Sequence, residues 1–189
     1  FTANNAVTFG NSSADNLRLF TDAVTIRTLG AGSTLTVNSR VDGDNDLTFD
    51  TADAAIFNAQ VGDGTPIGDG TGAAITINST GLTTFVRNLT TASGIVQGVG
   101  AGTVTFRRDV TVNGGDTANT FNENVILDGL TFTSAKDITF GNATSDQLNL
   151  TTAAAIIDTS VAGANVTFNS KIDGNQDLTV NSGTGTTTF

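Results

Sequence analysis

The amino-acid sequence predicts an all-β protein, a parallel β-helix (β-solenoid) in which short strands stack coil upon coil. Three observations predict this fold: a 131-residue internal repeat, a short strand unit that recurs along the whole chain, and a composition rich in Thr, Gly and Asn. Long internal repeats are typical of solenoids and arrays, in which each unit packs only on its neighbours.

The repeat relates the first 56 residues to the segment Phe132–Thr187. Shifting Phe1–Ile56 by 131 positions aligns the two segments without a gap, and 23 of the 56 positions are identical. The identities include many turn residues, so we expect loops of the same lengths in both copies. We therefore treat 1–189 as one continuous repetitive segment.

The strand unit consists of an aliphatic residue, one further residue and a second large apolar residue. It occurs 14 times, and the middle residue is Thr in 11 of them. A period of two places both apolar residues on one face and Thr on the other. The units are Val7–Phe9, Leu17–Leu19, Val24–Ile26, Leu35–Val37, Leu47–Phe49, Ile75–Ile77, Val104–Phe106, Val110–Val112, Val125–Leu127, Leu130–Phe132, Ile138–Phe140, Leu148–Leu150, Val166–Phe168 and Leu178–Val180.

The composition predicts no helix. The chain has 35 Thr, 22 Gly and 19 Asn, and it has no Cys, Met, Trp, Tyr or His. Thr favours strands, whereas Gly, Asn and Asp favour turns. The Ala-rich segments Thr51–Ala59 and Thr151–Ile157 are predicted as strand or coil, because the second aligns with Phe20–Ile26, which alternates as a strand.

Clusters of Gly, Asn and Asp separate the strand units and predict the corners, because these residues accept a positive φ. Strand centres recur about every 8 to 12 residues. A coil of two or three strands then needs about 20–30 residues, and the repeat makes about four to six coils. The glycine-rich segment Gly62–Gly72, which contains Pro66, is expected to bulge from the body as a loop.

A tandem array of β-sandwiches is the alternative fold, because it also gives Thr-rich strands and a period near 100 residues. Three features favour the solenoid over it. The chain has no Trp or Tyr for a sandwich core, its strand units are short, and no polar or Pro-rich linker separates the copies.

Charge and hydropathy restrict the partners. The net charge is −10, with only eight basic residues, which argues against a nucleic acid. No apolar run approaches the roughly 20 residues that a membrane helix needs, so no membrane insertion is expected in this segment. The chain has no initiator Met and begins inside a repeat, so an export signal and an anchor are expected outside it.

Several stretches resemble repetitive bacterial surface proteins. Asp137–Asn142, Val166–Ser170 and Asp177–Phe189 are similar to β-strand-repeat proteins of the filamentous haemagglutinin and autotransporter adhesin type. The resemblance implies a right-handed β-helix, an extracellular or cell-surface location, and a role in adhesion, sheath or matrix. It carries over no functional residue.

One candidate metal site is Asp42–Asp46, which spaces three carboxylates like the start of a calcium loop. Such a loop needs Gly at its sixth position and Glu at its twelfth, where Leu47 and Asp53 stand. In the second copy Asn175 replaces Asp44. We interpret the segment as a turn with capping Asp residues and expect no cofactor or metal.

A second candidate is a carboxylate pair of Asp63 and Asp69 for glycoside hydrolysis, since polysaccharide-active enzymes also use β-helices. The chain lacks Tyr, Trp and His for sugar binding, so we assign no catalytic residue. Six Asn residues also begin the Asn-x-Ser/Thr pattern of N-glycosylation. They are Asn11, Asn78, Asn88, Asn142, Asn149 and Asn165.

The sequence thus predicts a non-catalytic structural component of an extracellular fibre, adhesin stalk or cell-surface sheath. An adhesive module that binds glycans or a host surface is the alternative, and a polysaccharide-active enzyme is a weaker one. Both ends of the chain are predicted as strand and corner without a cap. We therefore expect end-to-end association, with another copy or with neighbouring repeats of a longer chain.

Overall fold

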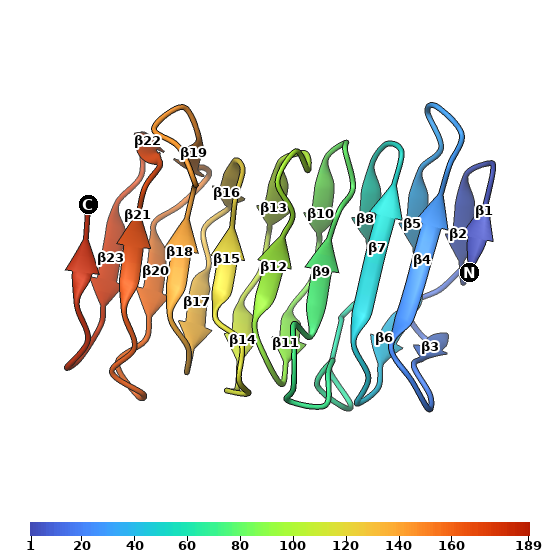
Figure 1. Cartoon of the computed structure of the whole chain (residues 1–189), viewed down its shortest axis with the longest axis horizontal. Coiled ribbons are helices and arrows are strands. Elements are labelled where there is room, and N and C mark those ends of the chain that lie inside the picture. The colour runs from blue at the N-terminus through green and yellow to red at the C-terminus, as the bar shows by residue number, and fades with distance from the viewer.

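Short parallel strands build the whole molecule, and no helix is present. The computed structural model describes all 189 residues, which form 24 strands wound into about eight turns (Figure 1). Each turn contributes a strand, or in one turn the single bridged residue Val61, to each of three faces. All strand pairs are parallel, and a strand always pairs with the equivalent strand of the next turn. This confirms the predicted β-solenoid.

Sheet A has nine strands and contains the first strand of every turn. Its strands are β1 (Thr2–Ala3), β4 (Val24–Thr28), β7 (Leu47–Thr51), β9 (Ile75–Ile77), β12 (Ile95–Gln97), β15 (Asn119–Phe121), β18 (Ile138–Phe140), β21 (Val166–Phe168) and β24 (Thr187–Thr188).

Sheet B has eight strands and follows sheet A in each turn. Its strands are β2 (Val7–Phe9), β5 (Leu35–Val37), β8 (Ala55–Phe57), β10 (Thr83–Phe85), β13 (Val104–Phe106), β16 (Val125–Leu127), β19 (Gln147–Leu150) and β22 (Lys171–Gly174).

Sheet C completes each turn. Its strands are β3 (Asn16–Arg18), β6 (Arg40–Asp42), β11 (Leu89–Thr91), β14 (Val110–Val112), β17 (Thr131–Ser134), β20 (Ala155–Asp158) and β23 (Leu178–Asn181). Val61 bridges Val41 on one side and Leu89 on the other, so β3 and β6 continue into the other five strands.

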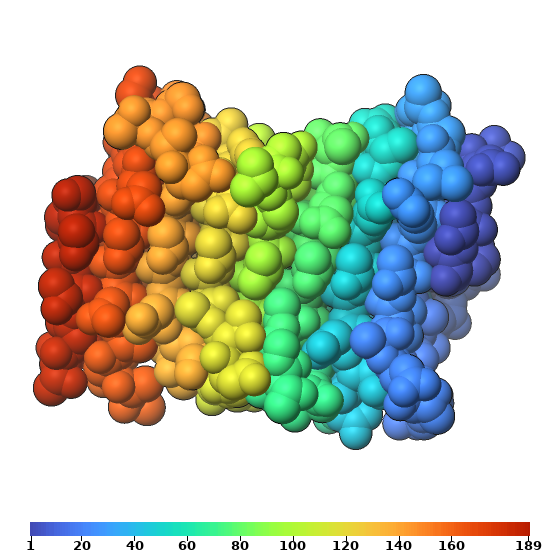
Figure 2. Space-filling view, viewed as in Figure 1, coloured from blue at the N-terminus to red at the C-terminus, as the bar shows by residue number.

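The solenoid winds to the right. In Figure 1 sheet A lies in front and its strands run upward, while the chain advances from the N-terminus at the right to the C-terminus at the left and returns downward behind. Right-handed crossovers are the rule between parallel strands, because the strand twist favours them. The coils stack without a break along the axis (Figure 2).

The interior is apolar along the whole axis. The middle residue of most strands faces outward, and its two neighbours point into one continuous core of 33 buried hydrophobic residues. Most strand units expose Thr and bury Val, Ile, Leu or Phe, as the alternation predicts. Polar side chains enter the core chiefly at strand ends and corners, where they find backbone partners: Thr91, for example, donates its hydroxyl to the carbonyl of Ser93 at 2.7 Å.

Two stacks of phenylalanine rings run through this core. In sheet B, Phe85 lies parallel to both Phe57 and Phe106, with ring centroids 5.0 and 5.4 Å apart. In sheet A a second stack joins Phe121, Phe140, Phe168 and Phe189. The two stacks meet edge to face at Phe106 and Phe121, 5.7 Å apart. Such pairs add about 0.5–1.5 kcal/mol each beyond the burial of their surface.

The segment Gly62–Gly72 forms the longest corner, but it is tied to the body. Ile67 is fully buried in the core and bridges Thr91 of the next turn. The backbone N–H of Gly68 donates to the carbonyl of Asn45 at 3.2 Å. The loop predicted to bulge therefore returns to the core at its midpoint.

The two sequence copies have the same backbone geometry. Thr21 and its counterpart Thr152 are the only non-glycine residues with positive φ, at 72° and 66°. The hydroxyl of Thr28 donates to the carbonyl of Ser33, and that of Thr159 donates to the carbonyl of Ala164, 131 positions further on. Local sequence therefore dictates the same corners in both places.

The copies nevertheless occupy different faces of the solenoid. Strands β1, β4 and β7 of sheet A correspond to β17, β20 and β23, which belong to sheet C. In the same way sheet B of the first copy corresponds to sheet A of the second, and sheet C corresponds to sheet B. From β1 to its counterpart β17 the chain passes 16 strand positions, and the bridged residue Val61 adds one more. With three positions in each turn, these 17 positions make five turns and two further faces. The repeat is therefore rotated by two-thirds of a turn.

Phe140→Ala tests the facing of the strand units. Phe140 is 1% exposed and stacks on two rings, so we expect a loss of about 3–5 kcal/mol in the free energy of unfolding. Its counterpart Phe9 lies in the first turn and is only partly buried, so Phe9→Ala should cost clearly less. Denaturant unfolding of both variants measures this; equal, small losses would place Phe140 outside the core.

Candidate functional site

The carboxylate of Asp42 is committed to holding the long corner. It is 5% exposed and accepts hydrogen bonds from the backbone N–H groups of Gly64, at 2.8 Å, and Thr65, at 3.3 Å. The side-chain amide of Asn16, one turn back, donates to its other oxygen at 2.9 Å. Asp42 therefore links three successive turns, which agrees with its interpretation as a capping residue.

Asp46, at the other end of the candidate calcium segment that we interpret as a turn, lies at the start of a different corner. Burial raises its pKa above the ordinary value, the carboxylates of Asp69 and Asp116 raise it further, and a hydrogen bond from the backbone N–H of Asp69 opposes the rise. No group of three or more acidic side chains converges in a geometry that would hold a metal ion. The carboxylates of Asp42 and Asp46 thus face different neighbours and do not converge on one point.

Asp63 and Asp69, the candidate carboxylate pair, have different partners. Asp63 lies 3.8 Å from the guanidinium of Arg40. Asp69 accepts hydrogen bonds from the hydroxyl and backbone N–H of Thr71, and these lower its pKa. A general acid for glycoside hydrolysis needs a raised pKa, whereas the pKa of Asp69 is lowered.

The six Asn residues of the glycosylation pattern lie on the surface to different degrees. Asn11, Asn78, Asn88, Asn142 and Asn165 are exposed, whereas Asn149 is half-buried within β19. Asn11 and Asn142 occupy equivalent corners, in which Asp15 and Asp146 accept hydrogen bonds from successive backbone N–H groups.

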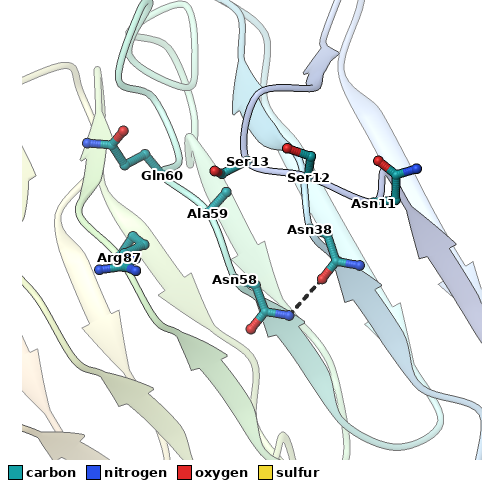
Figure 3. Close-up of a pocket in the computed structure, with 8 residues that line it drawn as sticks. All are labelled: Asn11, Ser12, Ser13, Asn38, Asn58, Ala59, Gln60 and Arg87. Atoms are coloured by element: carbon teal, nitrogen blue, oxygen red, sulfur yellow. Dashed lines mark hydrogen bonds between the residues drawn. The ribbon is translucent and has the colours of Figure 1, made fainter.

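The most developed hollow on the surface is an amide-lined groove at the corner between sheets B and C. It measures about 520 Å³ and is open to solvent. Its walls come from four successive turns (Figure 3). The lining residues are Asn11, Ser12, Ser13, Asn38, Asn58, Ala59, Gln60 and Arg87.

Hydrogen-bonding side chains organise the groove. The side-chain amide of Asn58 donates to the amide oxygen of Asn38 at 2.8 Å, and Asn38 in turn donates to the carbonyl of Gly10 at 3.2 Å. Figure 3 shows this pair at one edge of the group, with Ser12 and Ser13 next to it and Gln60 and Arg87 further along. The lining has no carboxylate and only one hydrophobic residue, Ala59. It is suited to a polar ligand rich in hydroxyl groups.

Sequence reasoning did not single out this groove. Its residues come from separate loops about one turn apart, so their proximity depends on the length of each turn. The available signal was the spacing between Asn38 and Asn58, each of which directly follows an inward apolar residue, Val37 or Phe57.

A second, shallower hollow of about 420 Å³ lies at the corner between sheets C and A. Lys136 lies there between Asp116 and Asp137, with small residues around them. Its lining carries two carboxylates and one ammonium group, and Lys136 forms no ion pair with either Asp.

The comparisons with known proteins give no relative. No protein-family model, no curated protein and no solved structure matches this chain. The structure has no helix of the length and apolarity needed to cross a membrane.

Asp46→Asn should stabilise the protein at neutral pH. Since folding raises the pKa of Asp46, its contribution to stability is greatest below the ordinary value of 3.8 and is lost as the pH rises through the raised pKa. The variant removes the charge but keeps an oxygen for the N–H of Asp69. We expect its melting temperature to exceed that of the wild type at pH 7 and the difference to vanish near pH 3.

Asp158→Asn is the matched control for this measurement. Hydrogen bonds from Ser160 lower the pKa of Asp158, so its ionised form favours the folded state and its removal should lower the melting temperature at pH 7. The argument from burial would be contradicted if Asp46→Asn melted below the wild type at pH 7. It would also be contradicted if the difference in melting temperature did not change with pH.

Calcium should not affect folding. The two oxygens of Asp42 already accept three hydrogen bonds from the protein, so the melting temperature should be the same in excess calcium and in excess chelator. Differential scanning calorimetry measures both. A midpoint several degrees lower in chelator, absent in Asp44→Asn, would restore a calcium site at Asp42–Asp46.

Proposed function

We propose that this chain is a non-catalytic structural segment of an extracellular fibre, adhesin stalk or cell-surface sheath, of the kind formed by repetitive bacterial surface proteins. The observation that carries the proposal is one uninterrupted core along the axis, lined by a repeated strand unit. A rod of this kind grows in length by about 4.8 Å for each turn, whatever the number of turns. Length is the property that a stalk or sheath requires.

The direction of the hydrogen bonds supports a load-bearing role. Because strands pair along the axis, the backbone bonds between successive turns lie parallel to it, in three sheets at once. A force along the axis acts on all three rows together. The structure has 98 backbone–backbone hydrogen bonds, and most of those within sheets have this direction.

The composition of the outer faces is consistent with a fibre that is surrounded by solvent. Thr residues cover much of the outer faces, charged residues are few, and the net charge is −10. Self-repulsion of this sign keeps long assemblies apart. The candidate carboxylates have capping or ion-pair partners, which favours a non-catalytic role.

We also propose that the two end turns continue the stack, through further turns of the same chain or through another copy. Val7, Leu17 and Leu178 are only partly buried in the end turns. Their counterparts Ile138, Leu148 and Leu47 are 0% exposed inside the stack. An added turn would bury the same side chains and pair the free strand edges.

Association of the 189-residue chain tests this proposal. We expect polymers in analytical ultracentrifugation, filaments by electron microscopy, and fibre diffraction with a reflection near 4.8 Å along the filament axis. Lys substitutions at Thr188 and Ile172, on the free edges of β24 and β22, should reduce polymer formation. A monodisperse monomer at high concentration would contradict end-to-end pairing.

A further inference from the structure

The corner between sheets B and C has a constant length in four consecutive turns. Phe57 pairs with Phe85 and Phe85 with Phe106, while beyond the corner Val61 pairs with Leu89 and Leu89 with Val110. Three residues lie between these paired positions in each turn. The corner residues 38–40, 58–60, 86–88 and 107–109 therefore stack in register. We call these twelve residues the corner ladder.

Basic side chains occupy one half of the corner ladder. The register places Arg108 directly after Arg87 along the axis, with Arg107 beside them, and all three are exposed. None of the three forms an ion pair, since the only ion pairs in the structure are Arg27–Asp50 and Arg40–Asp63. In a chain with eight basic residues and a net charge of −10, this is a local concentration of unpaired positive charge.

Amides occupy the other half of the corner ladder. Asn38, Asn58 and Gln60 line the groove together with Arg87, and the strand register places Arg108 next to Arg87 in the following turn. The ladder thus presents a line of donors, amides first and guanidinium groups after, spaced by about 4.8 Å per turn.

The acidic residues in or beside the ladder have partners other than Arg87, Arg107 and Arg108. Asp63 lies beside Arg40. Asp109, the last residue of the ladder, accepts a hydrogen bond from the backbone N–H of Thr131 at 2.9 Å. Asp128, in the following turn, accepts hydrogen bonds from the hydroxyls of Thr151 and Thr152.

We propose that the corner ladder binds an acidic polysaccharide laid along the solenoid axis. Guanidinium groups bind carboxylate or sulfate groups by paired hydrogen bonds, and the amides and Ser hydroxyls of the groove suit sugar hydroxyls. This binding role goes beyond the structural role of the fibre and would attach it to a matrix of anionic glycans.

The chemistry favours a glycan over a nucleic acid. A nucleic acid carries charge at every nucleotide, and its single-stranded form is held by exposed aromatic rings on which bases stack. The corner ladder has three guanidinium groups without an ion pair, four amide side chains and no aromatic residue. An acidic polysaccharide offers carboxylates for the guanidinium groups and many hydroxyls for the amides, which matches this mixture.

The start of the ladder recurs in the second copy. Asn169, Ser170 and Lys171 correspond to Asn38, Ser39 and Arg40, but they lie at the corner between sheets A and B. The side-chain amide of Asn169 donates to the carbonyl of Gly141, as Asn38 does to Gly10. The second copy thus begins a ladder of the same kind on another edge of the rod.

Binding of polygalacturonate, a polymer of acidic sugars, tests the proposal. Biolayer interferometry with the immobilised 189-residue chain should show binding that weakens as salt is raised from about 0.05 to 0.3 M, because exposed charges are screened. Neutral dextran and oligothymidylate serve as comparison ligands and should bind at least tenfold more weakly.

The double variant Arg87→Gln/Arg108→Gln should reduce polygalacturonate affinity at least tenfold. The matched control, Arg18→Gln/Lys136→Gln, removes the same net charge away from the ladder and should change the affinity less than twofold. Asn58→Ala, which changes no charge, should weaken binding severalfold. Melting temperatures of all variants verify that they fold.

Three outcomes would overturn the proposal. They are absence of binding by the wild type, equal losses in the ladder and control double variants, and oligothymidylate binding as tight as that of polygalacturonate. None of these outcomes bears on filament formation, which is measured separately by ultracentrifugation and electron microscopy.

Discussion

The structure depends on one constraint: parallel strands stack in register, so each turn must present a side chain of the same class at the same point of the core. A shift of one residue would turn every inward side chain outward. Strands of three residues satisfy the constraint with two inward apolar positions and one outward Thr. Variation is confined to the corners, which differ in length from the three residues 58–60 to the long segment 62–74.

Rotation of the repeat by two-thirds of a turn follows from the near equivalence of the three faces. A strand unit such as Val7–Phe9 requires only a parallel neighbour above and below and an apolar interior beside it, and each sheet offers both. The phenylalanine stacks show the same property, because the stack passes from sheet B to sheet A where Phe106 meets Phe121 edge to face. The two similar segments therefore share the geometry of their corners, although they lie on different faces of the solenoid.

The sequence was sufficient to predict the fold class, since all 14 strand units lie in or overlap strands. The alternation of apolar residues did not predict the strands in which an inward residue is polar. Asn119, at 0% exposure, accepts a hydrogen bond from the N–H of Ile95 and donates to Ser134, and Thr83 and Thr91 also point inward. The contact between Asn119 and Ile95 joins separate turns, and a polar residue at an inward position breaks the apolar alternation.

The candidate site was less predictable than the fold. Asp42 does accept backbone hydrogen bonds as a capping carboxylate does, but from Gly64 and Thr65 one turn further on and not from its own turn. The corner ladder depends on the number of residues in each turn, which runs from 19 to 28 between successive sheet A strands. That number is set by loops such as 62–74, whose path the sequence does not dictate locally.

Because the repeat spans five and two-thirds turns, the sequence repeat and the turns of the solenoid are out of step. In an array of such units, each copy would turn its equivalent surface to a different side, and the original side would return only after three copies and 17 turns, roughly 80 Å along the axis. A flat partner touching one side would therefore meet the unit at long intervals, whereas a partner surrounding the rod would meet it from every direction. Even identical units would thus produce a rod without a preferred side.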